Sequence, residues 1–253
     1  MHKHLKAKFD VAILAHRGYN KKYPENTLLA FKKAIEAKAD YIELDVRLTK
    51  DRMLVVNHDK STLRITGKNY IVANTDYKIL RSLDFGQGEK IPTMEEVLDL
   101  CKGKIGVQIE LTNSGTAKPM VDLVTKFKME NEVLFSSFYH AEIAKVKELN
   151  PNLVCTVLEP SLLSFSSIMK GIVNPQSFFS DARKLEVEGI NPPFPFVTKA
   201  FCRKAHKLGL FVLPFTVDSP ILWGKLIAAG ADGIFTNDPG KLHAFLANRV
   251  QEK

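Results

Sequence analysis

The sequence predicts an α/β barrel, in which parallel strands alternate with helices around a central sheet. Short apolar runs alternate with helix-length segments along the chain, as parallel strands joined by crossover helices require. The chain has 253 residues, and such barrels commonly use about 250 residues as one domain. His16-Arg17-Gly18, Glu43-Leu44-Asp45 and His58-Asp59 lie in or just after three apolar runs. Because barrels keep their chemistry at the carboxyl ends of strands, we expect the site there.

The expected strands are short and rich in Val, Ile, Leu and Phe. Helical spacing of apolar residues lies between them, as at Leu28, Phe31 and Ile35. The eight expected strands cover residues 11–15, 41–46, 105–111, 132–135, 153–158, 185–189, 210–215 and 232–235.

Two helix starts are indicated by capping residues. Asn26 precedes Thr27 and is expected to accept the free amides of a first helical turn. Thr93 stands three residues before Glu96, the spacing of a capping box. The polar segment from Lys60 to Ile91 is too long for an ordinary connection. We therefore predict a single domain over residues 1–253, with a small insertion at about residues 60–91.

Charge and cysteine content exclude several classes of protein. The 36 Lys and Arg exceed the 28 Asp and Glu by 8, but they form no dense cluster, so no nucleic-acid partner is expected. Cys101, Cys155 and Cys202 are isolated, which argues against a disulfide framework or a zinc site and favours a reducing compartment. No signal peptide or integral membrane segment is evident. We expect a cytoplasmic protein, and its oligomeric state stays open.

Two carboxylates in the second strand point to a metal ion. Residues i and i+2 of a strand face the same way, so Glu43 and Asp45 share a face with Tyr41. Paired carboxylates inside a barrel repel each other and lose hydration unless a cation lies between them, and Mg²⁺ or Ca²⁺ suits such oxygen ligands. A half-exposed strand, or neutralisation by lysines, is the alternative.

The third strand supplies a possible additional ligand. Gln108, Glu110 and Thr112 alternate with apolar residues, so Glu110 lies on the polar face near the strand end. Alone, this glutamate would be expected to form a salt bridge. Beside the other two carboxylates it could complete a divalent-ion site.

Two histidines and an arginine stand at the same expected rim. His16 and His58 each follow an apolar run, and histidine can act as general acid or base near neutral pH. Arg17 could bind phosphate oxygens with its guanidinium fork. Structural histidines and a surface arginine are the alternatives. Together these residues favour metal-assisted phosphodiester cleavage.

The same residues carry a resemblance to the glycerophosphodiester phosphodiesterase family. The similarity extends over nearly the whole chain, and the order of its motifs is specific. The matching segments are His16-Arg17-Gly18, Pro24-Glu25-Asn26-Thr27, Ala39 to Val46, Leu48-Thr49-Lys50-Asp51, Val55 to Asp59 and Ile91 to Leu98, with weaker matches at Ile109-Glu110, Ser136-Ser137-Phe138, Phe215 to Asp218 and Asp232 to Pro239.

This resemblance implies a (β/α)8 TIM barrel with a small insertion after the second strand. It implies hydrolysis of glycerophosphodiesters, small-molecule substrates, to glycerol phosphate and an alcohol. The implied metal ligands are Glu43, Asp45 and Glu110. The implied acid and base pair is His16 and His58. Substrate contacts are expected at Arg17, Thr112 and Phe215.

Departures from the family pattern keep other functions open. Thr112 occupies the position of a usual lysine, and Phe215 and Asp218 replace a usual tryptophan and asparagine. One alternative is a phospholipase D acting on lysophospholipid head groups; another is a barrel that binds phosphodiesters without cleaving them. Elsewhere, Trp223 is expected to be packed, and His140, His206 and His243 to lie at the surface. An apolar groove for a longer lysophospholipid would draw on Leu162, Leu163, Phe165, Ile168, Met169, Phe178 and Phe179. Such a cluster more commonly forms part of the core or of a helix face, and that is the favoured interpretation.

Overall fold

Eight parallel strands form the centre of the molecule in the computed structural model, which describes residues 5–160 and 176–251. Their spatial order is β8-β7-β6-β5-β4-β2-β1-β9, so neighbours in the sheet are also neighbours in the chain. The strands are β1 (Ala12–Ala15), β2 (Tyr41–Leu48), β4 (Gly106–Leu111), β5 (Val133–Ser137), β6 (Cys155–Leu158), β7 (Gly189–Asn191), β8 (Phe211–Val212) and β9 (Gly233–Thr236).

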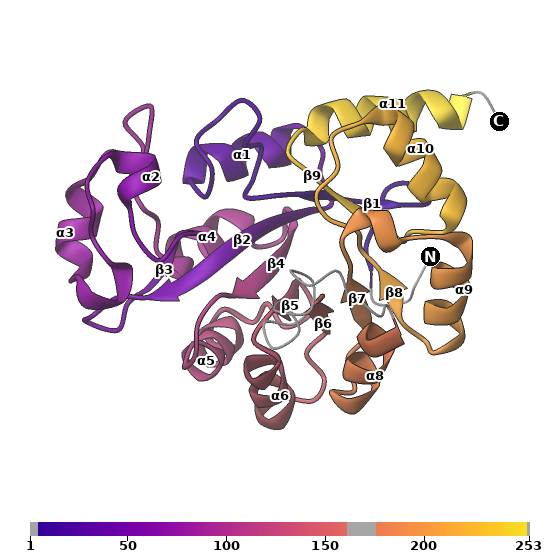
Figure 1. Ribbon diagram of the computed structural model, residues 1–253. Coiled ribbons are helices and arrows are strands. Elements are labelled where there is room, and N and C mark those ends of the chain that lie inside the picture. Colours follow the sequence, from indigo (N-terminus) through magenta and orange to yellow (C-terminus); the bar gives the residue numbers. More distant parts are fainter. Residues whose placement is uncertain (1–4, 161–175, 252–253) are drawn as a thin grey trace.

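Backbone hydrogen bonds close this sheet into a barrel. The amide of Asp232 donates to the Val212 carbonyl over 2.9 Å, and the Phe235 amide donates to Pro214 over 3.1 Å. Helices surround the strands (Figure 1). They are α1 (Leu28–Glu36), α4 (Met94–Cys101), α5 (Ala117–Phe127), α6 (His140–Leu149), α8 (Gln176–Lys184), α9 (Lys199–Lys207), α10 (Pro220–Ala229) and α11 (Pro239–Gln251), with the short η2 (Phe194–Phe196) before α9.

Side-chain alternation on β2 separates the helix-facing core from the barrel interior. Ile42 and Leu44 belong to the large apolar core that also contains Phe31 of α1. Tyr41 instead packs inside the barrel, in a cluster that includes Leu14. The strand therefore directs its remaining odd-numbered residues inward, as expected from the period of two.

Most strand predictions are confirmed to within a few residues, and one is misplaced. Residues 185–189 were expected as the sixth strand, but β7 is Gly189–Asn191. The helix α8 extends to Lys184, and the turn that follows places Glu186 at φ 52°. Leu185 and Val187 are therefore apolar residues of a helix-to-strand connection, which a short apolar run alone does not distinguish from a strand.

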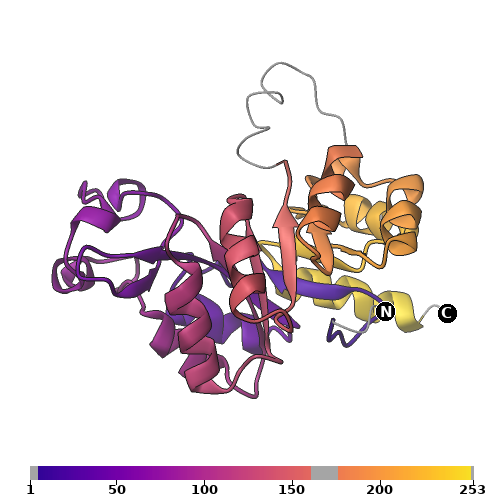
Figure 2. The ribbon, with the colours of Figure 1, turned by 90° about the horizontal axis from the view of Figure 1, so that it is seen from below.

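A short strand and three helical turns follow β2. Strand β3 (Leu54–Val56) pairs antiparallel with β2 and was not predicted as a strand. After it come α2 (Leu63–Thr66), η1 (Val72–Asn74) and α3 (Tyr77–Ser82). Figures 1 and 2 place this region on the opposite side of the barrel from α9. It has a small apolar core of its own, formed by Val55, Val72, Leu80, Leu83, Phe85 and Ile91.

The two predicted helix caps differ in outcome. Thr93 and Glu96 form the expected capping box. The expectation for Asn26 is wrong, because Thr27 is the N-cap and accepts from the Ala30 amide. Asn26 instead adopts φ 57° and donates its side-chain amide to Asp45 over 2.9 Å. A residue expected to cap a helix thus contacts the site.

Candidate active site

The His16-Arg17-Gly18 turn begins the site at the end of β1. Arg17 has φ 53° and Gly18 has φ 78°, so the chain turns sharply there. A Cβ on residue 18 would lie 2.8 Å from Ala30, so only glycine lets the turn approach α1 this closely. The Arg17 amide then donates to a Glu43 carboxylate oxygen over 2.8 Å.

The three predicted metal ligands lie together on the neighbouring strands β2 and β4. Asp45 and Glu110 occupy paired positions in the parallel ladder, and Glu43 faces the same side two residues earlier. One carboxylate oxygen from each residue lies within 4.8 Å of the others. Oxygen ligands of this type suit a hard divalent cation. The cluster could therefore hold a metal ion.

Burial makes this cluster electrostatically unfavourable when it is fully ionised. Burial, with the nearby charge of Asp45, raises the pKa of Glu43 to about 8. The same two causes raise the pKa of Glu110 well above its usual range. A cation would remove this penalty because it neutralises the charge that burial disfavours. The donor set therefore fits a divalent ion.

His16 is held by Asn237, which is itself held by Asp218. Its Nδ1 lies 2.7 Å from Oδ1 of Asn237, whose amide nitrogen donates to Asp218 over 2.7 Å. Because that amide group is already oriented by Asp218, its oxygen is left to accept the Nδ1 proton. Burial, and then the charge of Arg17, lowers the pKa of His16. The lowered pKa favours the neutral imidazole, in which Nδ1 carries the proton and Nε2 does not.

His58 is oriented in a similar way by the residue that follows it. Its Nδ1 donates to Oδ1 of Asp59 over 2.7 Å, since a carboxylate can only accept. The side chain of Arg47 donates to the carbonyls of Asn57 and His58, which fixes the backbone. The sequence did not predict the contact of Asp59 with His58 or the contacts of Arg47. The side chain of Arg47 could have been expected to point inward, because it follows Asp45 by two residues in the same strand.

Arg17 lies within a network of acidic side chains. Its guanidinium is 3.0 Å from Glu25 and 3.5 Å from Asp45. Glu25 also accepts two hydrogen bonds from Arg64, at 2.7 and 2.9 Å. Glu25 and Arg64 were not proposed as site residues from the sequence. Only the family motif around residues 24–27 directs attention to Glu25.

A cavity of about 210 Å³ opens between these polar residues and an apolar wall. His16, Arg17, Glu43, His58 and Glu110 line one part of it, so the structure brings both histidines to one pocket. Thr112 is not among the residues that line it; this residue is buried, and its hydroxyl donates to the Val46 carbonyl over 2.7 Å. The other lining residues are Phe138, Leu158, Phe215, Thr216 and Phe235.

The proposed apolar groove is not supported by the residues that can be located. Phe178 and Phe179 are buried, and both contact Phe201 of α9. The groove's other candidates lie outside the described residues. Trp223 is packed as expected, fully buried and donating to the Val217 carbonyl.

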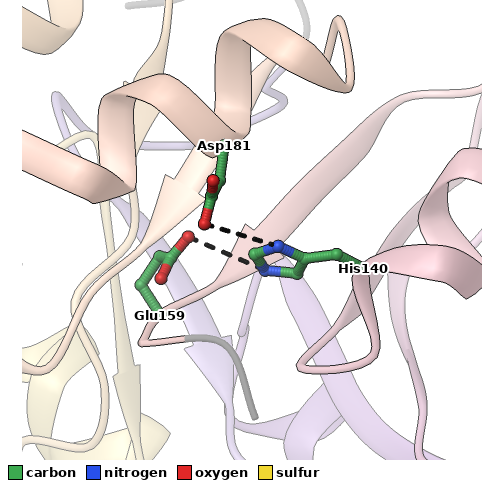
Figure 3. Close-up of side chains that lie close together, drawn as sticks. All are labelled: His140, Glu159 and Asp181. Carbon is green, nitrogen blue, oxygen red and sulfur yellow. Dashed lines mark ion pairs between the residues drawn. The ribbon is translucent and has the colours of Figure 1, made fainter. Parts of the chain in front are cut away.

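A second group of titratable residues lies where α6, β6 and α8 meet. His140 is 3.7 Å from Glu159 and 3.8 Å from Asp181 (Figure 3). The expectation that His140 lies at the surface is wrong, since its side chain is only 17% exposed. His243 is likewise only partly exposed and packs against Phe9, whereas His206 is exposed as expected.

Comparison with known proteins identifies the family. The model of the glycerophosphoryl diester phosphodiesterase family matches residues 16–241. The chain belongs to this family. It is 35% identical to the uncharacterized protein YqiK of Bacillus subtilis, covering 93% of this chain and 98% of that protein. It is 34% identical to a glycerophosphodiester phosphodiesterase of Caldanaerobacter subterraneus, covering 91% and 95%.

The solved structures agree on the fold. A glycerophosphodiester phosphodiesterase from Thermotoga maritima superposes with a TM-score of 0.79 at 27% identity, covering 92% of this chain and 97% of that one. The expected (β/α)8 TIM barrel is thereby confirmed, and the chain is an enzyme of the phosphodiesterase class. Among the described residues, no helix has the length and apolar character needed to cross a membrane.

Proposed function

We propose that this chain is a single-domain enzyme that hydrolyses glycerophosphodiesters to glycerol phosphate and an alcohol with the help of a divalent cation. The observation that carries the proposal is one small pocket lined by two oriented histidines and by two members, Glu43 and Glu110, of a carboxylate triad. Membership of the family and the names of the relatives support the substrate class.

Glu43, Asp45 and Glu110 would hold the cation, which we propose to be Mg²⁺ or Ca²⁺. When bound, such an ion draws charge from a phosphate oxygen and lowers the pKa of an attacking hydroxyl or water. The Arg17 amide and the Asn26 side chain each donate to one carboxylate of the triad. These donors hold the carboxylates in place and leave other oxygens for the ion.

The histidines would divide the proton transfers. One removes a proton from the attacking hydroxyl or water, and the other protonates the departing alkoxide. Where a substrate hydroxyl attacks, the product of this step is a cyclic phosphate, and water then opens it to glycerol phosphate. Because Nδ1 of each ring donates to a fixed acceptor, Nε2 is the atom available for these transfers. Arg17, whose side chain lines the pocket, would bind phosphate oxygens.

The aromatic wall would bound the alcohol group of the substrate. Phe215 stacks edge-on with Phe138 and with Phe235, at centroid distances of 6.1 and 6.4 Å. We propose that Phe215 contacts the substrate there. For Thr112, whose hydroxyl is occupied, a substrate contact stays a prediction.

The experiment that tests this function is a substrate panel assayed with the full chain after removal of metal. Glycerophosphocholine, glycerophosphoethanolamine, glycerophosphoglycerol and a lysophospholipid are each incubated with Mg²⁺, Ca²⁺ or chelator. We expect glycerol phosphate release only with an added ion. Faster cleavage of the lysophospholipid would favour the phospholipase D alternative, and binding without cleavage of any substrate would favour a non-catalytic barrel.

A further inference from the structure

One guanidinium from the region after β3 reaches two carboxylates that border the site. Arg64, on α2, donates Nε to Asp59 over 2.6 Å. Its two terminal nitrogens donate to the two oxygens of Glu25, at 2.9 and 2.7 Å. Each of the three guanidinium nitrogens thus donates one hydrogen bond to an acidic side chain.

Asp59 is the residue through which this contact reaches the chemistry. Its second oxygen, Oδ1, accepts the Nδ1 proton of His58 over 2.7 Å. The carboxylate therefore bridges Arg64 and His58 with one oxygen for each. If the carboxylate rotated away, Nδ1 would lose its acceptor, and the Nδ1–H tautomer would lose its advantage over Nε2–H.

The hydrogen bonds to Glu25 fix the position of the Arg64 guanidinium. The Arg64 side chain is 49% exposed, and an exposed ion pair with a single flexible contact contributes little to stability. The bidentate fork on Glu25 restricts the guanidinium, because both planar groups must align. Glu25 is itself fixed by its ion pair with Arg17 at 3.0 Å. Arg64 is thus held on one side and can hold Asp59 on the other.

We propose that Arg64 is a positioning residue, which keeps Asp59 hydrogen-bonded to His58 and so presents Nε2 of that histidine to the pocket. This inference rests on the proposed function, in which His58 transfers a proton. It gives the region after β3 a role in catalysis that does not depend on touching the substrate.

The first test compares Arg64→Gln with Arg81→Gln. Arg81, on α3, forms the same bidentate pair with Glu96, at 2.7 and 3.1 Å, and also donates to the Ile91 carbonyl; neither partner lines the pocket. We expect Arg64→Gln to lower kcat about tenfold with KM changed less than about twofold, and Arg64→Lys to restore part of the loss. Parental kcat in Arg64→Gln, or an equal loss in Arg81→Gln, would overturn the proposal.

A double variant tests the route through Asp59. If Arg64 acts through this carboxylate, adding Arg64→Gln to Asp59→Asn lowers kcat no further than Asp59→Asn alone. Two losses that multiply would mean that Arg64 acts elsewhere, and the inference would be wrong.

An independent measurement does not need activity. Nitrogen NMR of ¹⁵N-histidine-labelled protein reports which ring nitrogen of His58 carries the proton, with a His58→Gln variant to assign the signal. The parent and Arg81→Gln should be mainly Nδ1–H, and Arg64→Gln a mixture of tautomers. An unchanged tautomer in Arg64→Gln would refute the inference. A parent that cleaves no phosphodiester would instead refute the proposed function.

Discussion

Single residues place the chemical groups of this site, and the histidines are the simplest to test. His16→Ala and His58→Ala should each lower kcat by about a hundredfold or more, the effect of losing a general acid or base. Both rings lie at the pocket rim, so folding should survive. Steady-state kinetics on glycerophosphodiesters checks this, with exposed His206→Ala as the control. Near-parental turnover in either site variant would remove that histidine from the mechanism.

The metal ligands give a second prediction at this scale. Chelator should abolish activity, and Glu43→Gln, Asp45→Asn and Glu110→Gln should each weaken the rise in Tm that Mg²⁺ or Ca²⁺ produces. The reason is that a bound ligand stabilises the folded state by an amount that grows with the logarithm of its concentration over its Kd, so weaker binding gives a smaller rise in Tm. Glu95→Gln, an exposed glutamate paired with Lys126, is the control and should keep the full shift. Full activity in excess chelator would exclude the metal hypothesis.

Alanine substitutions at Gly18 and Gly103 distinguish the cost of a positive φ from the cost of a steric clash. Both have positive φ, at 78° and 69°, but only at Gly18 would a Cβ meet another atom within 4 Å. Gly103→Ala should cost about 1–2 kcal/mol from φ alone. Gly18→Ala should cost more and also lower kcat, because the turn that carries His16 and Arg17 must move. Urea denaturation and kinetics measure both effects, and equal costs with unchanged kcat would contradict this account.

At the scale of elements, the sequence predicts the direction of side chains in a strand, because this direction alternates along the chain. It does not predict structure that depends on contacts between residues far apart in sequence. The inward direction of Glu43, Asp45 and Glu110 follows from a period of two and is confirmed by the β2–β4 register. Asn26 resembles a helix cap, yet its role depends on Asp45 lying beside it in space. Strand β3 has three residues and needs β2 as a partner, so its pattern was too short to predict it.

The ion pairs between α2 and the loops at the barrel rim predict a pH effect on stability. Burial favours the neutral form of Glu25, but hydrogen bonds and charge from Arg64 and Arg17 outweigh it, and the pKa of Glu25 is lowered. The pKa of Asp59 is also lowered, against the effect of burial, by Arg64 and His58. A lowered folded pKa gives stability that is present above the unfolded pKa, about 4 for such groups, and lost as pH falls below it.

Glu25→Gln should therefore reduce stability at pH 7 and flatten its decline between about pH 5 and pH 3. Urea midpoints measured across this range, with Glu95→Gln as control, test the sign. A decline as steep in Glu25→Gln as in the parent would show that these ion pairs do not contribute.

At the scale of the whole molecule, one end of the barrel carries the candidate active site and the other end contributes to stability. Polar side chains gather at the carboxyl ends of the strands, whereas the N-terminal segment closes the opposite end. Leu5 is buried with Tyr41 and Phe211 in the barrel interior, and the amide of Lys6 donates to the Tyr41 hydroxyl over 2.9 Å. Changes at this end should alter stability without altering chemistry.

Leu5→Ala tests this separation. Removing a buried leucine side chain from the interior should lower the free energy of unfolding by about 2–3 kcal/mol, toward the lower end of the usual range because a chain end can adjust. Turnover should match the parent at temperatures where both are folded, because the histidines and carboxylates of the site are not part of the apolar cluster that contains Leu5. Leu63→Ala, at a leucine that is 51% exposed, is the matched control and should change neither quantity. Parental stability in Leu5→Ala would mean that the segment does not seal the barrel, and a lower kcat in the folded variant would mean that the two ends are coupled.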